Sequence, residues 1–168
     1  MANTADLDFL RQVSLFKDLS ADQLAALLSR LKERRIRKGE VLFREGEPGD
    51  ELFVIREGSV LISKPIVGRA EQVLARFGPG DFFGEMSLFD QAPRSATVQA
   101  ETETLMFCLD RESLQHLIKA SPDAAAAFFF RLAEVFIRRL RETGELVAEV
   151  TRWGLEATGL DADYQLPG

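Results

Sequence analysis

A glycine, a short apolar segment and an arginine stand close together between residues 83 and 98. Gly84 precedes Glu85-Met86-Ser87, which we expect to begin a short helix whose first N–H groups lack partners within the helix. Such a helix start attracts anions, and a glycine beside it lets a ligand approach the backbone. Arg94 follows Pro93, and its planar guanidinium suits two oxygens of one phosphate. The segment therefore predicts a phosphate-binding site.

Glu85 places a second requirement on the ligand. A carboxylate repels a phosphate that it touches, but it accepts hydrogen bonds from hydroxyl groups such as those of a sugar. A phosphorylated ribose meets both demands, with its anion at Arg94 and a hydroxyl at Glu85. Ser95 adds a hydroxyl beside Arg94. These roles describe binding rather than catalysis, although a simple surface salt bridge between Glu85 and Arg94 is the alternative interpretation.

The other reactive residues indicate no catalytic or metal centre. Ser87 does not fit the Gly-x-Ser-x-Gly pattern of a nucleophile elbow. The chain has one histidine, His116, and one cysteine, Cys108, which excludes multi-histidine metal sites, four-cysteine clusters and an intrachain disulfide. We expect His116 on an exposed helix surface and Cys108 buried in a strand. We therefore expect no enzyme activity, no metal and no cofactor.

Short apolar runs separated by turn residues fill the region from residue 35 to residue 109. Turn sequences such as Gly46-Glu47-Pro48-Gly49-Asp50 and Gly78-Pro79-Gly80-Asp81 separate the runs. About eight short strands at this spacing predict a jelly roll or barrel. The expected fold is α+β and mainly β, an eight-stranded jelly-roll β-barrel flanked by N-terminal helices and a long C-terminal helix. Within it, we expect a strand to begin at Arg94.

Helical patterns lie on both sides of this region, in residues 1–34 and 110–150. Ser20 and Gln23 have the spacing of a capping box at the start of an apolar helical stripe. Asp110 is expected to cap a short helix that ends near residue 119. A longer helix is expected to begin with Ser121-Pro122 and to continue to about residue 150.

The chain is thus expected to form a single functional domain followed by an acidic tail over residues 151–168. The tail is expected to be at most partly ordered. On the long helix, Phe136, Leu140 and Val147 could form the seam of a homodimer or could pack on their own domain. Phe128-Phe129-Phe130 is expected to lie in the core, with a lid over the ligand as the alternative for one ring.

The overall charge limits the partners. The chain of 168 residues has 21 Lys and Arg against 27 Asp and Glu, a net charge of −6, which gives no general attraction for nucleic acids or anionic membranes. The basic stretch over residues 30–38 is conceivable as a nucleic-acid patch, but a solvated helix end fits better. The N-terminal residues lack the pattern of a signal peptide, and the longest apolar run is too short to span a bilayer. We therefore expect a cytoplasmic protein without a membrane partner.

Two stretches, in order along the chain, resemble the cyclic-nucleotide-binding domain family. One is Phe83-Gly84-Glu85-Met86-Ser87-Leu88, followed after five residues by Arg94-Ser95-Ala96-Thr97-Val98, which is similar to the phosphate-binding cassette of that family. The other runs from Arg37-Lys38-Gly39-Glu40-Val41-Leu42-Phe43 through Gly46, Gly49-Asp50 and Leu52-Phe53-Val54-Ile55 to Gly58 and Val60. The resemblance covers about residues 9 to 150.

The resemblance implies a role for each residue of the cassette. Glu85 would bind the ribose 2′-hydroxyl and Arg94 the cyclic phosphate, while Ser95 would reach the phosphate or the base. Backbone N–H groups from the helix start would add to the phosphate site, and Ala96 would be small because its strand packs close to the ligand. The candidate ligand-binding residues are Phe83, Gly84, Glu85, Met86, Ser87, Arg94, Ser95 and Ala96.

The implied function is that of a sensor or regulatory protein whose C-terminal helix moves when a cyclic nucleotide binds. The expected ligand is cAMP, with cGMP as the alternative because Ser95 is compatible with either base. A different class of function is a non-enzymatic dimeric interaction scaffold with a degenerate cassette that holds no ligand.

The sequence also departs from several members of the family. Only 18 residues follow Val150, so we expect no helix-turn-helix domain and no DNA partner. We likewise expect no fused kinase, channel or cyclase segment. We therefore expect a stand-alone protein that acts, as a homodimer, on a downstream protein that the sequence does not identify.

Overall fold

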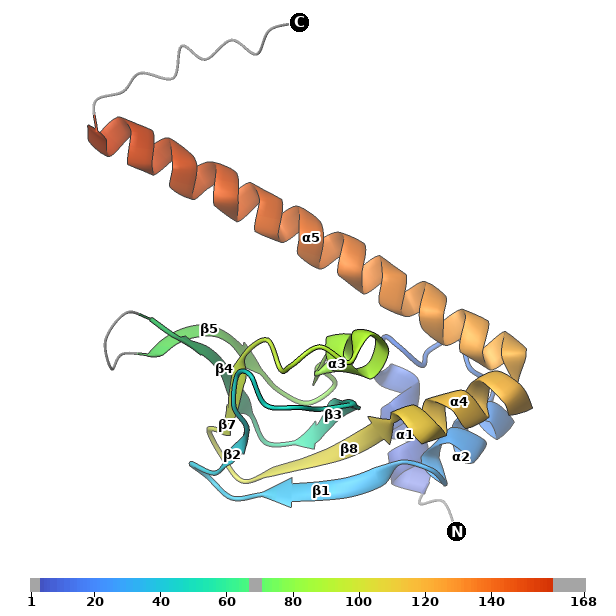
Figure 1. Ribbon diagram of the computed structural model, residues 1–168. Coiled ribbons are helices and arrows are strands. Elements are labelled where there is room, and N and C mark those ends of the chain that lie inside the picture. Colours follow the sequence, from blue (N-terminus) through green and yellow to red (C-terminus); the bar gives the residue numbers. More distant parts are fainter. Residues whose placement is uncertain (1–3, 67–70, 159–168) are drawn as a thin grey trace, which may run out of the picture. The chain divides into compact units, whose positions relative to one another are not determined.

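The computed structural model describes residues 4–66 and 71–158, in which eight strands pair as two antiparallel sheets (Figure 1). One sheet has the order β1 (Lys32–Ile36), β8 (Thr104–Asp110), β3 (Glu51–Glu57) and β6 (Phe82–Phe83). The other has the order β2 (Val41–Phe43), β7 (Thr97–Ala100), β4 (Val60–Pro65) and β5 (Glu71–Phe77). The expected number of strands is confirmed among the described residues, but these strands form two separate sheets instead of one closed barrel.

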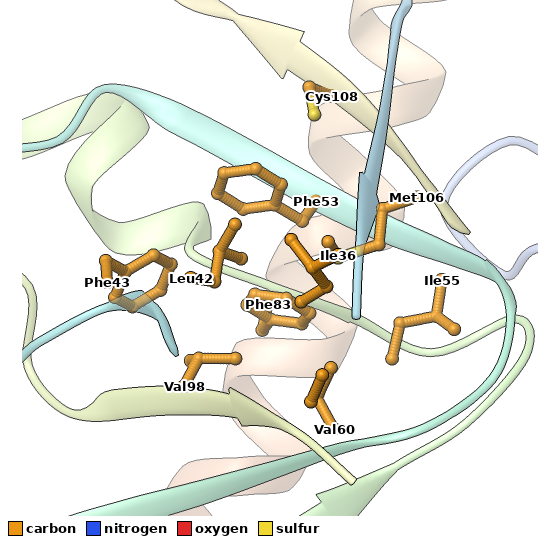
Figure 2. Packing of buried hydrophobic residues seen from close by; sticks show 11 residues of the cluster. Ile36, Leu42, Phe43, Phe53, Ile55, Val60, Phe83, Val98, Met106 and Cys108 are labelled. Carbon is orange, nitrogen blue, oxygen red and sulfur yellow. The ribbon is translucent and has the colours of Figure 1, made fainter. Parts of the chain in front are cut away.

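The chain divides into two compact units, residues 1–129 and residues 130–168. All eight strands lie in the first unit, whose core is filled by apolar side chains from both sheets (Figure 2). Phe43 of β2, Phe53 of β3 and Phe83 of β6 lie together there, and the rings of Phe53 and Phe83 stack with centroids 5.4 Å apart. Each buried ring of this kind stabilises the fold by roughly 1.5–3 kcal/mol. The three rings form an aromatic floor within this core.

Two short helices, α1 (Thr4–Gln12) and α2 (Ala21–Leu28), precede the strands. The capping box is confirmed, because the Ser20 hydroxyl accepts from the Gln23 N–H at 3.3 Å and the Gln23 side chain accepts from the Ser20 N–H at 2.8 Å. The strands begin at Lys32, earlier than the expected boundary at residue 35. Strand β1 lies at a sheet edge and only Ile36 of its side chains is buried, so its charged residues hide the alternation typical of a strand.

The helices after the strands follow the expected order but not the expected length. Helix α4 (Arg111–Ala120) is capped by Asp110, whose carboxylate accepts from the Ser113 N–H at 2.8 Å. Helix α5 (Pro122–Thr158) continues past the expected end at Val150. The tail over 151–168 was expected to be at most partly ordered. Residues 151–158 are helical, and the rest of that tail lies outside the described residues.

The three phenylalanines near the start of α5 differ in burial. Phe128 is fully buried and stacks on Phe16 with ring centroids 6.0 Å apart, whereas Phe129 and Phe130 are exposed. The expectation of a core position is thus confirmed for the first ring only.

None of the helices in residues 4–66 and 71–158 is long and apolar enough to cross a membrane.

Candidate functional site

The expected short helix is present directly after Gly84, as α3 (Glu85–Asp90). Gly84 has a φ of +80°, a left-handed conformation that glycine adopts without strain. A Cβ atom at this position would lie 2.7 Å from the Glu51 carbonyl oxygen and 2.9 Å from Nη1 of Arg94. Glycine is therefore required here both for the backbone angle and for the close approach of Arg94.

The backbone of Arg94 is held by two hydrogen bonds that do not involve its side chain. Its N–H donates to the Glu47 carbonyl at 2.8 Å, and its carbonyl accepts from the Gly46 N–H at 2.9 Å. Strand β7 begins only at Thr97, so the expected strand start at Arg94 is three residues early. The backbone of Arg94 instead pairs with the turn that follows β2. This pairing directs the Arg94 side chain toward the aromatic floor.

The guanidinium of Arg94 is buried, with only 4% of the residue exposed. Its Nη1 donates to the Glu51 carbonyl at 2.9 Å and to the Gly84 carbonyl at 3.4 Å. Its Cζ lies 4.2 Å from the centroid of the Phe43 ring and 5.5 Å from that of Phe53, both within range of a cation–π interaction. The cation thus lies on the aromatic floor, held by two carbonyls.

Gly49 lies against the same guanidinium. A Cβ atom on Gly49 would come 2.1 Å from Nε of Arg94 and 2.3 Å from its Cζ, so no other residue fits without moving the arginine. From the sequence, Gly49 was placed in a turn and in the upstream stretch that resembles the family, but Phe43, Gly49 and Glu51 were not connected with Arg94. No spacing rule would have found these neighbours, because they are distant from Arg94 in sequence.

One donor of Arg94 is left over. Its Nε is the only buried side-chain nitrogen or oxygen without a hydrogen-bond partner among the described residues. Burial lowers the pKa of Arg94, while the nearby carboxylates of Glu51, Asp50 and Glu47 raise it, and an arginine keeps its charge in proteins. Leaving a charged donor buried and unpaired costs more than about 1–3 kcal/mol. An anion that accepts from Nε would remove this cost.

The other predicted site residues lie around this arginine in different environments. Glu85 and Ser87 of α3 are buried, whereas Met86 is 53% exposed. Ser95 is exposed and Ala96 is half-buried, both in the bend that precedes β7. Phe83 lies in the core, stacked on Phe53. The structure therefore brings Gly84 and Arg94 into direct contact next to the start of α3.

Two contacts connect α3 to the elements that follow. The carbonyl of Ser87 accepts a hydrogen bond of 3.4 Å from Nη2 of Arg111, at the start of α4. The Phe89 ring lies 5.7 Å from the ring of Phe129, near the start of α5. Helix α3 is therefore in contact with α4 and with the start of α5.

The residues first considered for other chemistry lie elsewhere. Burial raises the pKa of the Cys108 thiol to about 12, so this side chain is not a nucleophile. His116 is exposed on α4, as expected. In residues 4–66 and 71–158, no three His, Cys, Asp or Glu side chains are placed to hold a metal ion.

The sequence model described as "Cyclic nucleotide-binding domain" matches residues 33–121, which is more than half of the chain and includes the whole of 83–98. The chain belongs to the cyclic nucleotide-binding domain family. The matched range contains every residue that holds Arg94 in place, from Phe43 to Gly84.

Proteins with a domain of this family resemble the chain over most of its length. The "CRP-like cAMP-activated global transcriptional regulator" of Mycobacterium tuberculosis is 33% identical over 143 residues, which cover 85% of this chain and 62% of the relative. The "Cyclic AMP receptor protein" of Thermus thermophilus is 36% identical over 128 residues, 76% of this chain and 57% of the relative. This chain therefore spans about three fifths of the length of these curated relatives.

A solved cyclic nucleotide-binding domain from Methylobacillus flagellatus has the same fold. It is 30% identical, with a TM-score of 0.75, and the match covers 86% of this chain and 82% of that structure.

Proposed function

We propose that the chain is a regulatory protein that binds a cyclic nucleotide, cAMP, between Arg94 and the start of α3. The observation that supports this most is the buried guanidinium of Arg94 with an unpaired Nε. A fixed, desolvated cation with a free donor suits an anionic ligand. The proposed role is therefore binding and not catalysis.

Each predicted residue has a part in the proposed complex. Arg94 donates from Nε to the cyclic phosphate, joined by the backbone N–H groups of Glu85, Met86 and Ser87. The Glu85 carboxylate accepts from the ribose 2′-hydroxyl. Gly84 allows the close approach, Ser95 reaches the phosphate or base, Ala96 leaves room, and Phe83 supports the floor.

The choice of cAMP is supported by the names of relatives. The two regulators described above are named for cAMP, and a regulatory protein of 31% identity was solved as "cAMP bound PfPKA-R (141-441)". A relative of 36% identity is a "cGMP-dependent protein kinase" of Drosophila melanogaster, so cGMP is the competing ligand.

Calorimetric titration with cAMP, cGMP and 5′-AMP tests the proposal, with Arg94→Leu as the key variant. Truncating one partner of a buried charge pair costs about 2–5 kcal/mol. This corresponds to a loss of roughly 30- to several-thousand-fold in affinity. A thermal melt checks that Arg94→Leu is folded before the titration.

The matched control is Arg35→Leu on β1, at the far edge of its sheet from β6, which removes an exposed ion pair of 2.7 Å with Glu103. This control should bind cAMP like the wild type. Equal affinity in Arg94→Leu and the wild type would contradict the assigned role of Arg94.

We also propose that binding moves α5. A ligand shifts such an equilibrium only if it contacts the two states differently. The contact between Phe89 and Phe129 offers a route, because a shift of α3 on the ligand displaces a ring at the start of α5. Hydrogen exchange of α5 should then change on addition of cAMP, and Phe89→Ala should reduce this change.

Homodimer formation through α5 completes the proposal. Leu140 is 74% exposed, and Phe136 and Val147 share its helix face at heptad spacing. Sedimentation of Leu140→Glu should show a monomer if this face is the dimer seam. The control Leu146→Glu changes an equally apolar, 60% exposed residue of α5 that points about 120° away from Leu140, and it should remain dimeric.

A further inference from the structure

A groove lies between α2 and α4 and shares no residue with the candidate nucleotide site (Figure 1). The two helices run antiparallel and are joined at both ends. Nε2 of Gln23, at the start of α2, donates to the hydroxyl of Ser121, just after α4, at 3.2 Å. The hydroxyl of Ser113, at the start of α4, donates to the carbonyl of Arg30, just after α2, at 3.4 Å. These two hydrogen bonds hold the helices in place, so the groove between them is preformed.

The middle of the groove is hollow and apolar. It is lined by the buried side chains of Leu27 and Leu117 and by the exposed Ala26 and Ala120, whose short side chains leave the space open. The hollow has a volume of about 220 Å³. Pockets for drug-sized ligands have volumes of about 300–1,000 Å³, so this hollow is small for such a molecule. Its size and apolar lining suit one anchoring side chain of a protein partner.

The two ends of the groove carry opposite charges. Asp22, Ala26 and Arg30 follow one another at intervals of four residues, which places them along one side of α2 and its end. The groove therefore has a carboxylate at one end and a guanidinium at the other, roughly 12 Å apart along α2. Both side chains are exposed, and neither forms an ion pair within the described residues. His116 adds an exposed imidazole to the lining from α4.

We propose that this groove is the docking site for an amphipathic helix of a partner protein, which inserts one apolar side chain into the hollow. The helix places an acidic residue opposite Arg30 and a basic residue opposite Asp22, so its charges complement both ends of the groove. Because four residues of a helix rise about 6 Å, the three positions are i, i+4 and i+8 of the partner. Docking of an amphipathic helix into an apolar groove uses anchors at such spacing.

Three synthetic helical peptides test the docking site on the full chain. Each peptide has leucine at i+4, and its residues at i and i+8 are one glutamate and one lysine, two glutamates or two lysines. Binding is read at low ionic strength from the methyl NMR signals of Ala26 and Ala120. The wild type should bind the mixed peptide roughly three- to tenfold more tightly than either like-charged peptide. Alanine in place of the peptide leucine should weaken binding by roughly tenfold or more.

Reversal of one charge in the groove should change which peptide is preferred. Arg30→Glu makes both ends acidic and should bind the two-lysine peptide most tightly. Asp22→Lys makes both ends basic and should bind the two-glutamate peptide most tightly. Ala120→Leu fills the hollow and should abolish the shift of the Ala26 signal. The control Ala126→Leu changes an exposed helical alanine outside the groove and should bind the peptides like the wild type.

Each result supports or overturns the proposal. Unchanged Ala26 and Ala120 signals with all three peptides at millimolar concentration overturn it. Equal affinities for the three peptides, or an unaltered preference in Arg30→Glu, also overturn it, because the charges at the ends would then not select the partner. Dissociation of a wild-type oligomer by Ala120→Leu, seen in sedimentation, would show that a second copy of this chain occupies the groove instead. None of these measurements involves a cyclic nucleotide, so a failure here is distinguishable from a failure of the proposed function.

Discussion

Gly49→Ala is the change that tests the position of the guanidinium most sharply. The new Cβ would lie 2.1 Å from Nε and 2.5 Å from Nη2 of Arg94, whereas ordinary contacts begin at 3.4 Å. The guanidinium must therefore move by roughly 1.3 Å, and the Phe43 ring, whose centroid is 4.2 Å from Cζ, limits the room for this movement. Gly49 does not have a positive φ, so alanine fits its backbone and the effect comes from the Cβ alone.

The cost to binding should exceed the cost to folding. The displaced arginine loses a charge-assisted hydrogen bond to the ligand, about 1.5–3 kcal/mol, which is roughly 10- to 150-fold in affinity for cAMP. The atoms that clash belong to the end of a side chain, so the protein relieves the overlap by moving it. Overpacking of this kind costs at most about 1–3 kcal/mol in the free energy of unfolding.

Calorimetry with cAMP and a thermal melt check the two expectations together. Gly78→Ala is the matched control, because its Cβ would meet nothing within 4 Å and its φ is not positive. The control should match the wild type in both measurements. Wild-type affinity in Gly49→Ala would refute the reasoning, because the guanidinium would then not hold the ligand from its observed position.

Three further predictions concern stability and reactivity. Gly144→Ala on α5 meets no steric obstacle and should raise the free energy of unfolding of the helix by about 1 kcal/mol, measured by circular dichroism; a lower melting temperature would contradict this. Partial burial opposes ionisation of Asp110, but hydrogen bonds from Lys32 and Ser113 prevail and lower its pKa from 3.8 to about 2. Because its pKa is lowered, Asp110 stabilises the fold above pH 4, and this stabilisation is lost as the pH falls to 2. Between these pH values the free energy of unfolding of Asp110→Asn should therefore fall by about 1–2 kcal/mol less than that of the wild type, after solvent screening. Cys108, with a pKa of about 12 caused by burial, should resist a thiol reagent at pH 8 in the native protein and react in urea; rapid native labelling would show that the strand opens.

Features set by local chemistry could be predicted from the sequence. Ser20 with Gln23, and Asp110 with Ser113, form the expected caps, because a cap depends only on residues within one helical turn. The short helix after Gly84 was predicted for the same reason. The approximate number of strands was also predicted, because turn residues separate the short apolar runs.

Features set by exposure or by distant contacts could not be predicted in this way. The strand at Lys32 was missed because an edge strand with charged side chains shows no alternation. The end of α5 was placed too early because loss of the apolar stripe was taken as the end of the helix. Arg94 is surrounded by Phe43, Gly49 and Glu51. These residues belong to β2, to the loop after it and to β3, and they meet the segment before β7 only in the folded protein. The identity of the arginine was predictable, but its orientation was not.

The unpaired Nε of Arg94 is proposed to receive the cyclic phosphate. Proton–nitrogen correlation spectra of the arginine Nε–H groups during titration with cAMP test this directly, with Arg94→Leu used to assign the signal. The Arg94 signal should move to the frequency of a strong hydrogen bond as cAMP saturates the protein. An unchanged Arg94 signal under saturating cAMP would contradict it.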